Sequence, residues 1–288
     1  MASTVSLDRP RSAPRAPRAR PTLTGVITWI AAACFLLVLA GVLISVVVES
    51  FATSWPGGWW PKGLTAHPYR QAWTDAGVGR AVLTSLEVGL VVIAISVVFG
   101  APVAYALSRR RFRGKSLVIV LLVLPVMLPP LTYAIQLSAL IYKLGLGGSL
   151  LGVIISNLVP ALPFVILITM PFVEQISPDV EDAARVFGAN TPRMFARVLF
   201  PLLLPGLLAA AILTLVRVFA AFELTFFVAG PRSQTLVVAL FGAASNPGTT
   251  SQTLVAAMAV CYMLTSVIVL AVALRFVNPT QVISRRRG

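Results

Sequence analysis

The residues of this chain that could do chemistry are charged side chains set inside long apolar stretches. Arg217 and Glu223 lie in the same stretch, six positions apart. Six positions turn an α-helix by roughly 600°, so the two side chains lie on different faces and do not neutralise each other locally. Because a charge within a membrane is costly, each needs another partner or a water-filled cavity. An ion pair with another helix and a place on a solute path are both open interpretations.

Four other polar residues lie within apolar stretches and can hydrogen-bond between helices or line a cavity. They are Glu87, Tyr133, Gln136 and Asn157. Glu87 lies about two turns inside its stretch, where the membrane interface is close. For a cationic solute, Glu223 is the preferred contact.

Catalytic and metal-binding motifs are absent from the sequence. The apolar stretches hold no paired Asp, HExxH or GxSxG, and the chain lacks the GxxxxGK[ST] loop that binds ATP. Cys34, Cys261 and His67 are isolated from one another, which disfavours a disulfide or a metal site. We therefore expect a chain that is not an enzyme, has no catalytic residues and binds no metal or cofactor itself.

The elements that must position these side chains are membrane-spanning helices. The 288 residues are 58% hydrophobic and only 11% charged, with a mean hydropathy of +0.91. A soluble domain of this size is less apolar and more charged. Six stretches are long enough to cross a hydrocarbon core of ~30 Å at ~1.5 Å per residue. They lie near 23–48, 81–107, 116–140, 151–173, 202–229 and 253–275.

The basic residues predict the orientation of the chain. A net charge of +14 could indicate a nucleic-acid partner, but Lys and Arg occur in short runs beside apolar stretches. With the N-terminus inside, cytoplasmic segments hold 17 of them and outer loops 5. Basic residues are retained on the cytoplasmic side. We therefore expect basic cytoplasmic tails at 1–22 and 276–288, a transmembrane domain over 23–275, and no nucleic-acid partner.

Proline and aromatic residues predict departures from straight spans. The third and fourth spans should be kinked or partly unwound, because proline removes a backbone donor. The prolines concerned are Pro125, Pro129, Pro130, Pro160 and Pro163. The outer loop 49–80, with several Trp residues among Pro and Gly, suits an interfacial aromatic belt or a short helix.

The loop 174–201 is the most informative segment and contains two helix starts. A Ser-Pro pair at 177–178 provides an N-cap and first turn, and Gly188 is a natural helix stop. A Thr-Pro pair at 191–192 repeats the start for a second short helix. The apolar anchors of that second helix are Met194, Phe195 and Val198. Two short helices meeting at a glycine turn form a rigid projection suited to a groove of a soluble partner.

This loop resembles the EAA loop of binding-protein-dependent ABC importer permeases. The matching pattern is Asp182-Ala183-Ala184-x3-Gly188-x9-Val198-x-Phe200-Pro201, in which Asp182 replaces the usual Glu. The resemblance implies an all-α integral membrane protein with six transmembrane helices in the type I ABC importer permease fold and a cytoplasmic helical coupling elbow. It also implies an ATPase-coupling role for Glu181, Asp182, Ala183, Ala184, Gly188, Phe195 and Pro201.

The same resemblance implies partners and a location. They are a second permease subunit in a heterodimer, two copies of an ABC ATPase that holds ATP and Mg, and an extracytoplasmic solute-binding protein. The chain would lie in the lipid of a bacterial inner (plasma) membrane with both termini cytoplasmic. Together the subunits would move a solute by alternating access.

The solute is less clearly indicated. The stretch 226–231 followed by Thr235-Leu236 is similar to the second permease of spermidine/putrescine-type systems, whereas 142–146 suits a sugar permease. We expect a polyamine-like or other small polar solute, with a carbohydrate as the alternative. A passive channel is also physically possible, but it would not explain the elbow.

Overall fold

The computed structural model describes residues 23–55, 58, 60–246 and 248–275, and of 23–26 the backbone only. The predicted tails 1–22 and 276–288 lie outside the described residues. The chain divides into two compact units, Met1–Ser45 and Val46–Gly288. The first contains most of α1 (Leu23–Ser50), a 28-residue helix whose mean hydropathy reaches 2.9. Its length and composition suit a membrane span.

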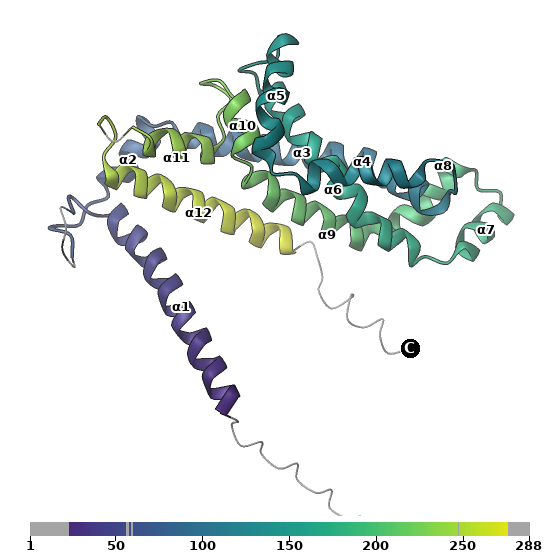
Figure 1. Ribbon diagram of the computed structural model, residues 1–288, viewed down its shortest axis with the longest axis horizontal. Coiled ribbons are helices and arrows are strands. Elements are labelled where there is room, and N and C mark those ends of the chain that lie inside the picture. The colour runs from purple at the N-terminus through teal and green to yellow at the C-terminus, as the bar shows by residue number, and fades with distance from the viewer. Residues whose placement is uncertain (1–22, 56–57, 59, 247, 276–288) are drawn as a thin grey trace, which may run out of the picture. The chain divides into compact units, whose positions relative to one another are not determined.

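The second unit is a bundle of helices (Figure 1). Its elements are α2 (His67–Thr74), α3 (Val78–Arg109), α4 (Lys115–Met127), α5 (Pro130–Lys143), α6 (Leu150–Glu174), α7 (Pro178–Val186), α8 (Thr191–Met194), the π-turn η1 (Phe195–Leu199), α9 (Phe200–Phe219), α10 (Glu223–Val228), α11 (Leu236–Ala244) and α12 (Gln252–Arg275). The long helices α3, α6 and α9 pack on one another, and α12 packs on α9, α11 and α2. The helix α2 falls within the 49–80 loop, where a short helix is one of the predicted alternatives.

Among the residues that the structure describes, five helices are long and apolar enough to cross a membrane, and the bent pair α4–α5 makes a sixth if it counts as one span. No named strand occurs in the described residues, where pairing is limited to one bridge between Ala52 and Leu64. The predicted all-α membrane architecture is confirmed.

Proline acts differently in the two spans that it was predicted to bend. The axes of α4 and α5 differ by 99° at the break between Met127 and Pro130, as expected where two successive prolines remove backbone donors. The predicted kink of the third span is therefore confirmed. In contrast, α6 continues through Pro160 and Pro163 as one helix, so the fourth span is not unwound.

The fifth span differs from its predicted bounds of 202–229. The helix α9 ends at Phe219, and α10 begins at Glu223 after three residues that belong to neither helix. Neither Gly nor Pro lies between Phe219 and Glu223. The residues between the two helices therefore do not predict the interruption.

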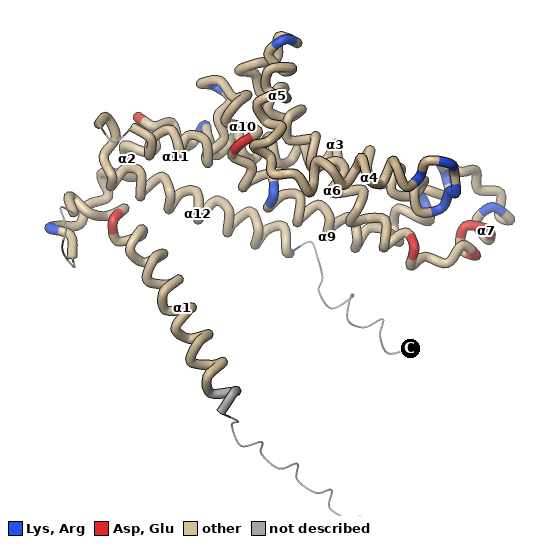
Figure 2. The backbone as a smooth tube through the Cα atoms, viewed as in Figure 1, with Lys and Arg blue, Asp and Glu red and all other residues tan. Residues whose placement is uncertain are grey.

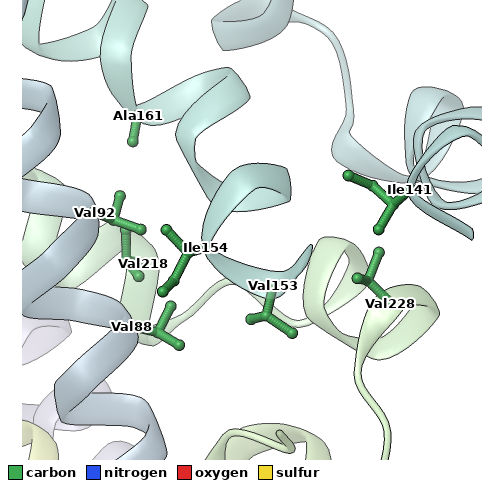
Figure 3. Close-up of a cluster of buried hydrophobic side chains, with 8 residues drawn as sticks. All are labelled: Val88, Val92, Ile141, Val153, Ile154, Ala161, Val218 and Val228. Atoms are coloured by element: carbon green, nitrogen blue, oxygen red, sulfur yellow. The ribbon is translucent and has the colours of Figure 1, made fainter. Parts of the chain in front are cut away.

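Aliphatic side chains from five helices meet where α3, α5, α6, α9 and α10 converge (Figure 3). The buried members are Val88, Val92, Ile141, Val153, Ile154, Ala161, Val218 and Val228. Lipid tails are as apolar as these side chains, so close packing and not exclusion from water holds such helices together. Small residues permit the closest approaches. A Cβ added at Gly89 would lie 3.1 Å from the Phe219 ring, and one added at Gly206 would overlap the Phe172 ring.

We predict that Gly206→Ala lowers the thermal unfolding midpoint of the detergent-solubilised protein, whereas Gly242→Ala does not. Both changes place alanine in a helix, which favours helix formation by about 1 kcal/mol. At Gly242 the new methyl group meets nothing within 4 Å. At Gly206 it pushes against Phe172, and overpacking typically costs about 1–3 kcal/mol. Equal midpoints for the two variants would show that the α6–α9 contact tolerates the added methyl group.

Candidate functional site

The interruption of the fifth span places two charged residues at helix ends. Arg217 lies in the last turn of α9, and Glu223 lies in the first turn of α10. A helix has a partial negative charge at its C-terminus and a partial positive charge at its N-terminus, so each residue complements its own helix. A continuous helix would offer neither charge this stabilisation.

Arg217 and Glu223 line one cavity of about 200 Å³, together with Asn157. The remaining lining is small or apolar and consists of Pro130, Pro160, Ala161, Val218, Ala220, Ala221 and Leu224. Segments far apart in sequence therefore meet here, from the start of α5, the middle of α6 and the α9–α10 junction. Of the six residues predicted for a solute path, the structure brings these three together.

The two charges do not pair with each other. Within the described part of the chain, the ion pairs involve other residues. The Arg217 guanidinium instead lies over the Phe164 ring, 4.9 Å from its centroid, in a cation–π contact. The cavity thus offers a cation, a carboxylate and an amide to a polar solute.

Asn157 also fixes the position of α10. Its Nδ2 donates to the Val153 carbonyl at 2.9 Å and to the Thr225 hydroxyl at 3.1 Å. The residue is only 2% exposed. A buried amide without partners is expensive, so these bonds hold the start of α10 against α6 and keep the cavity wall in place.

The other three predicted path residues do not line this cavity. Tyr133 is half-buried, and its hydroxyl donates to the Pro125 carbonyl at 3.3 Å across the α4–α5 bend. Gln136 and Glu87 are exposed on α5 and α3.

The second candidate region is the segment 174–201, called the elbow below. Its first helix, α7, starts as predicted, with the Ser177 hydroxyl accepting a bond from the Asp179 amide at 3.3 Å. Gly188 follows the end of α7 with φ +81°, a left-handed conformation that favours glycine.

The second start in the elbow differs from the prediction. Asn190, not Thr191, is the N-cap, and its side-chain oxygen accepts from the Arg193 amide at 3.0 Å. The expected second short helix continues through η1 into α9. The elbow therefore joins the fifth long helix directly.

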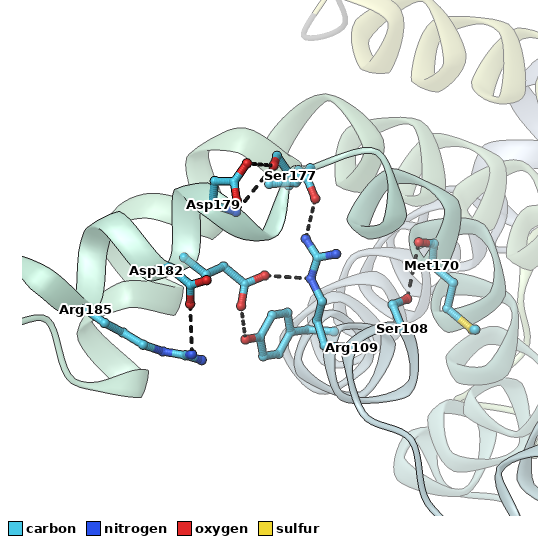
Figure 4. Close-up of polar contacts among 10 residues, drawn as sticks. Ser108, Arg109, Met170, Ser177, Asp179, Asp182 and Arg185 are labelled. Atoms are coloured by element: carbon cyan, nitrogen blue, oxygen red, sulfur yellow. Dashed lines mark hydrogen bonds and ion pairs between the residues drawn. The ribbon is translucent and has the colours of Figure 1, made fainter.

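The two adjacent acids of the elbow lie in opposite environments (Figure 4). The Asp182 side chain is 69% exposed and forms a surface pair with Arg185 at 3.4 Å. Glu181 is buried and bonds to Arg109 and Tyr105 of α3. Ala183 and Pro201 are exposed, and Ala184 is partly buried.

The large apolar residues of the elbow are divided between its base and its tip. Met194 is fully buried, and Phe195 packs edge-on against Tyr105 with ring centroids 5.7 Å apart. The two most exposed large apolar residues of the elbow are instead Val186 and Phe187, which are 85% and 90% exposed. Sequence reasoning missed these two. Because Val186 and Phe187 directly precede Gly188, where the helix ends, their position in the sequence could have indicated that they lie at the tip of the elbow.

Residues 96–281 match the family of binding-protein-dependent transport system inner membrane components. The trehalose transport permease SugB of Mycobacterium tuberculosis is 34% identical over 54% of this chain and 57% of its own length. A probable molybdenum ABC transporter permease of Haloferax volcanii is 32% identical over 54% of this chain and 61% of its own. The chain thus spans less than two thirds of these relatives.

Among solved structures, a bacterial ABC transporter that imports the acidic polysaccharide alginate is similar to this chain. The TM-score is 0.72 at 20% identity, covering 89% of this chain and 97% of the other. At this identity the likeness shows the fold alone.

We predict that the cavity admits water. In a chain whose two cysteines have been replaced, Ala220→Cys should react with a hydrophilic maleimide roughly tenfold faster than Leu213→Cys, because a thiol ionises less readily in apolar surroundings. Ala220 lines the cavity, whereas Leu213 is an exposed apolar residue of α9. The measurement is the labelling rate in membrane vesicles. Equal rates would contradict a water-filled cavity.

Proposed function

The chain belongs to the family of binding-protein-dependent transport system inner membrane components, and we propose that it forms part of the solute path of an ATP-driven importer in a bacterial inner membrane. The observation that carries this proposal is the polar cavity at the interruption between α9 and α10. Transporters commonly place solute sites at broken helices, where polar groups can face a cavity inside the membrane.

In this proposal the chain works with other subunits and has no catalytic role. A second permease, forming a heterodimer, supplies the other half of the path. Two copies of an ABC ATPase bind ATP and Mg, and an extracytoplasmic binding protein delivers the solute. The SugB relative is itself named as a permease of a transport system, which supports this division of roles.

The elbow is the proposed docking element for the ATPase. An exposed apolar tip formed by Val186 and Phe187 is costly in water and suits a groove of a soluble partner. Asp182 lies on the same exposed surface, while Gly188 sets the turn that follows. Lys and Arg gather at the end of the bundle that carries α7 (Figure 2). This distribution supports a cytoplasmic elbow and, with it, cytoplasmic termini.

A carbohydrate-like solute fits the cavity better than the polyamine-like solute that the sequence favoured. Arg217, Glu223 and Asn157 together supply donors and acceptors, and the two formal charges balance. Such a set suits neutral hydroxyl groups, and SugB, by its name, transports trehalose. A polyamine-like solute is the second candidate, because the Glu223 carboxylate would pair with an amine.

The test is uptake of labelled trehalose and labelled spermidine by proteoliposomes that contain the complete transporter. We expect trehalose uptake, and a loss of roughly tenfold or more in Glu223→Gln and Arg217→Gln, since a hydrogen bond to a charged group is worth about 1.5–3 kcal/mol. Glu87→Gln, a change outside the cavity lining, is the matched control and should resemble the unmodified protein.

Three outcomes decide between the candidates. Spermidine uptake that falls only in Glu223→Gln would establish the second candidate. Unchanged uptake in both cavity variants would remove the cavity from the solute path. Failure of the variant subunits to assemble would show that the two charges have a structural role.

A further inference from the structure

A buried cluster of polar side chains joins the elbow to the end of α3. The Glu181 Oε1 atom lies 2.6 Å from Arg109 Nε, and the Tyr105 hydroxyl donates to Glu181 Oε2 at 2.6 Å. Arg109 Nη2 also donates to the Ile176 carbonyl at 2.5 Å. Both carboxylate oxygens and two guanidinium nitrogens are therefore used, and three segments meet at one point (Figure 4).

The burial of this cluster distinguishes it from an ordinary surface pair. The side chains of Arg109 and Glu181 are only 17% and 7% exposed. A surface pair such as Asp182–Arg185 contributes little to stability. Removing one partner of a buried pair leaves an uncompensated charge, so the two groups resist separation strongly. The elbow cannot leave the end of α3 while this pair is intact.

Apolar contacts reinforce the same connection. The Tyr105 ring that bonds Glu181 also packs on Phe195 of η1. A buried cluster beneath the elbow combines residues of α3, α6, α8, η1 and α9, namely Ala101, Val173, Met194, Leu199, Leu203 and Leu207. One residue along from Arg109, the Ser108 hydroxyl donates to the Met170 carbonyl of α6 at 3.3 Å. The base of the elbow is therefore a packed unit and not a loose loop.

The helix α3 extends from this connection to the neighbourhood of the cavity. Its 32 residues run without a break from Val78 to Arg109, a length of about 48 Å at ~1.5 Å per residue. Val88 and Val92 of α3 belong to the same buried cluster as Val218 and Ala161, and these two also line the cavity. Because α3 continues through Pro102 as one helix, a displacement of Arg109 is passed along it to the cavity wall.

We propose that Glu181, Arg109 and Tyr105 are positioning residues that transmit movement of the docked elbow to α3 and so to the cavity. This inference rests on the proposed function of the chain as an importer subunit. Movement of the partner acts on the exposed tip, Val186 and Phe187, and passes through Glu181, five residues before Val186 on α7, to Arg109 at the end of α3. Glu181 thus acts through Arg109 and not by touching the ATPase.

The test follows the labelling of Ala220→Cys in the complete reconstituted transporter, without nucleotide and after trapping with ATP and vanadate. The readout requires no knowledge of the solute. In the Ala220→Cys parent, trapping should change the rate of maleimide labelling. Adding Glu181→Gln or Arg109→Gln should reduce this change roughly tenfold, within the range of allosteric coupling, while the ATPase still co-purifies and hydrolyses ATP.

The matched controls remove the same charges from exposed positions outside the elbow. Glu87→Gln and Arg111→Gln should keep the response of the parent. The double variant Glu181→Gln with Arg109→Gln should be no worse than either single variant, because residues that act as a pair are not additive. Phe187→Ala provides the contrast and should reduce retention of the ATPase itself.

Several results would overturn the proposal. Single variants that respond to nucleotide like the controls would show that the pair transmits nothing. If the charge variants fail to fold, Tyr105→Phe, which removes one hydrogen bond, is tested in their place. A change in labelling rate as large as that of the parent would then contradict the proposal. A parent that binds no ATPase would instead overturn the proposed function, and this inference with it.

Discussion

The cost of burying a charge away from water determines how the charged regions of this molecule are arranged. Such a charge must find a partner, water or the end of a helix. Arg109 and Glu181 partner each other where the elbow joins α3. Arg217 and Glu223 instead share a cavity, each at a helix end of matching polarity. Both charged regions of the chain are therefore places where this single constraint has been met in different ways.

Two long helices connect these regions. The segment that begins at α8 passes through η1 into α9 and ends at Arg217 and Phe219, beside the cavity. The helix α3 is bonded to the elbow through Tyr105 and Arg109. A π-turn inserted in a helix is frequently found at functional positions, and η1 lies where the elbow becomes a span. The elbow and the cavity are thus linked by packed, rigid elements and not by flexible loops.

The sequence alone was sufficient to predict the features of the structure that depend on local chemistry. Hydropathy located the spans, the Ser177-Pro178 pair located the start of α7, and Gly188 located its end. Features that depend on distant residues were not predictable. Glu181 and Asp182 are adjacent acids, roughly 100° apart on a helix, and only the arrival of Arg109, 72 positions away, decides which is buried. The break between Phe219 and Glu223 likewise contains no Gly or Pro. It depends on bonds such as Asn157 to Thr225, which hold α10 from another helix.

Hydrogen–deuterium exchange of the reconstituted protein tests whether the fifth span is interrupted at a wet, charged cavity. The amides of Ala220 and Ala221 still bond to carbonyls of α9, whereas those of residues 222–224 lie at the gap and in the first turn of α10, where amides have no partner within the helix. We expect rapid exchange over 222–224 and strong protection over 207–216, which lie within α9. Protection of 222–224 equal to that of 207–216 would contradict the interruption.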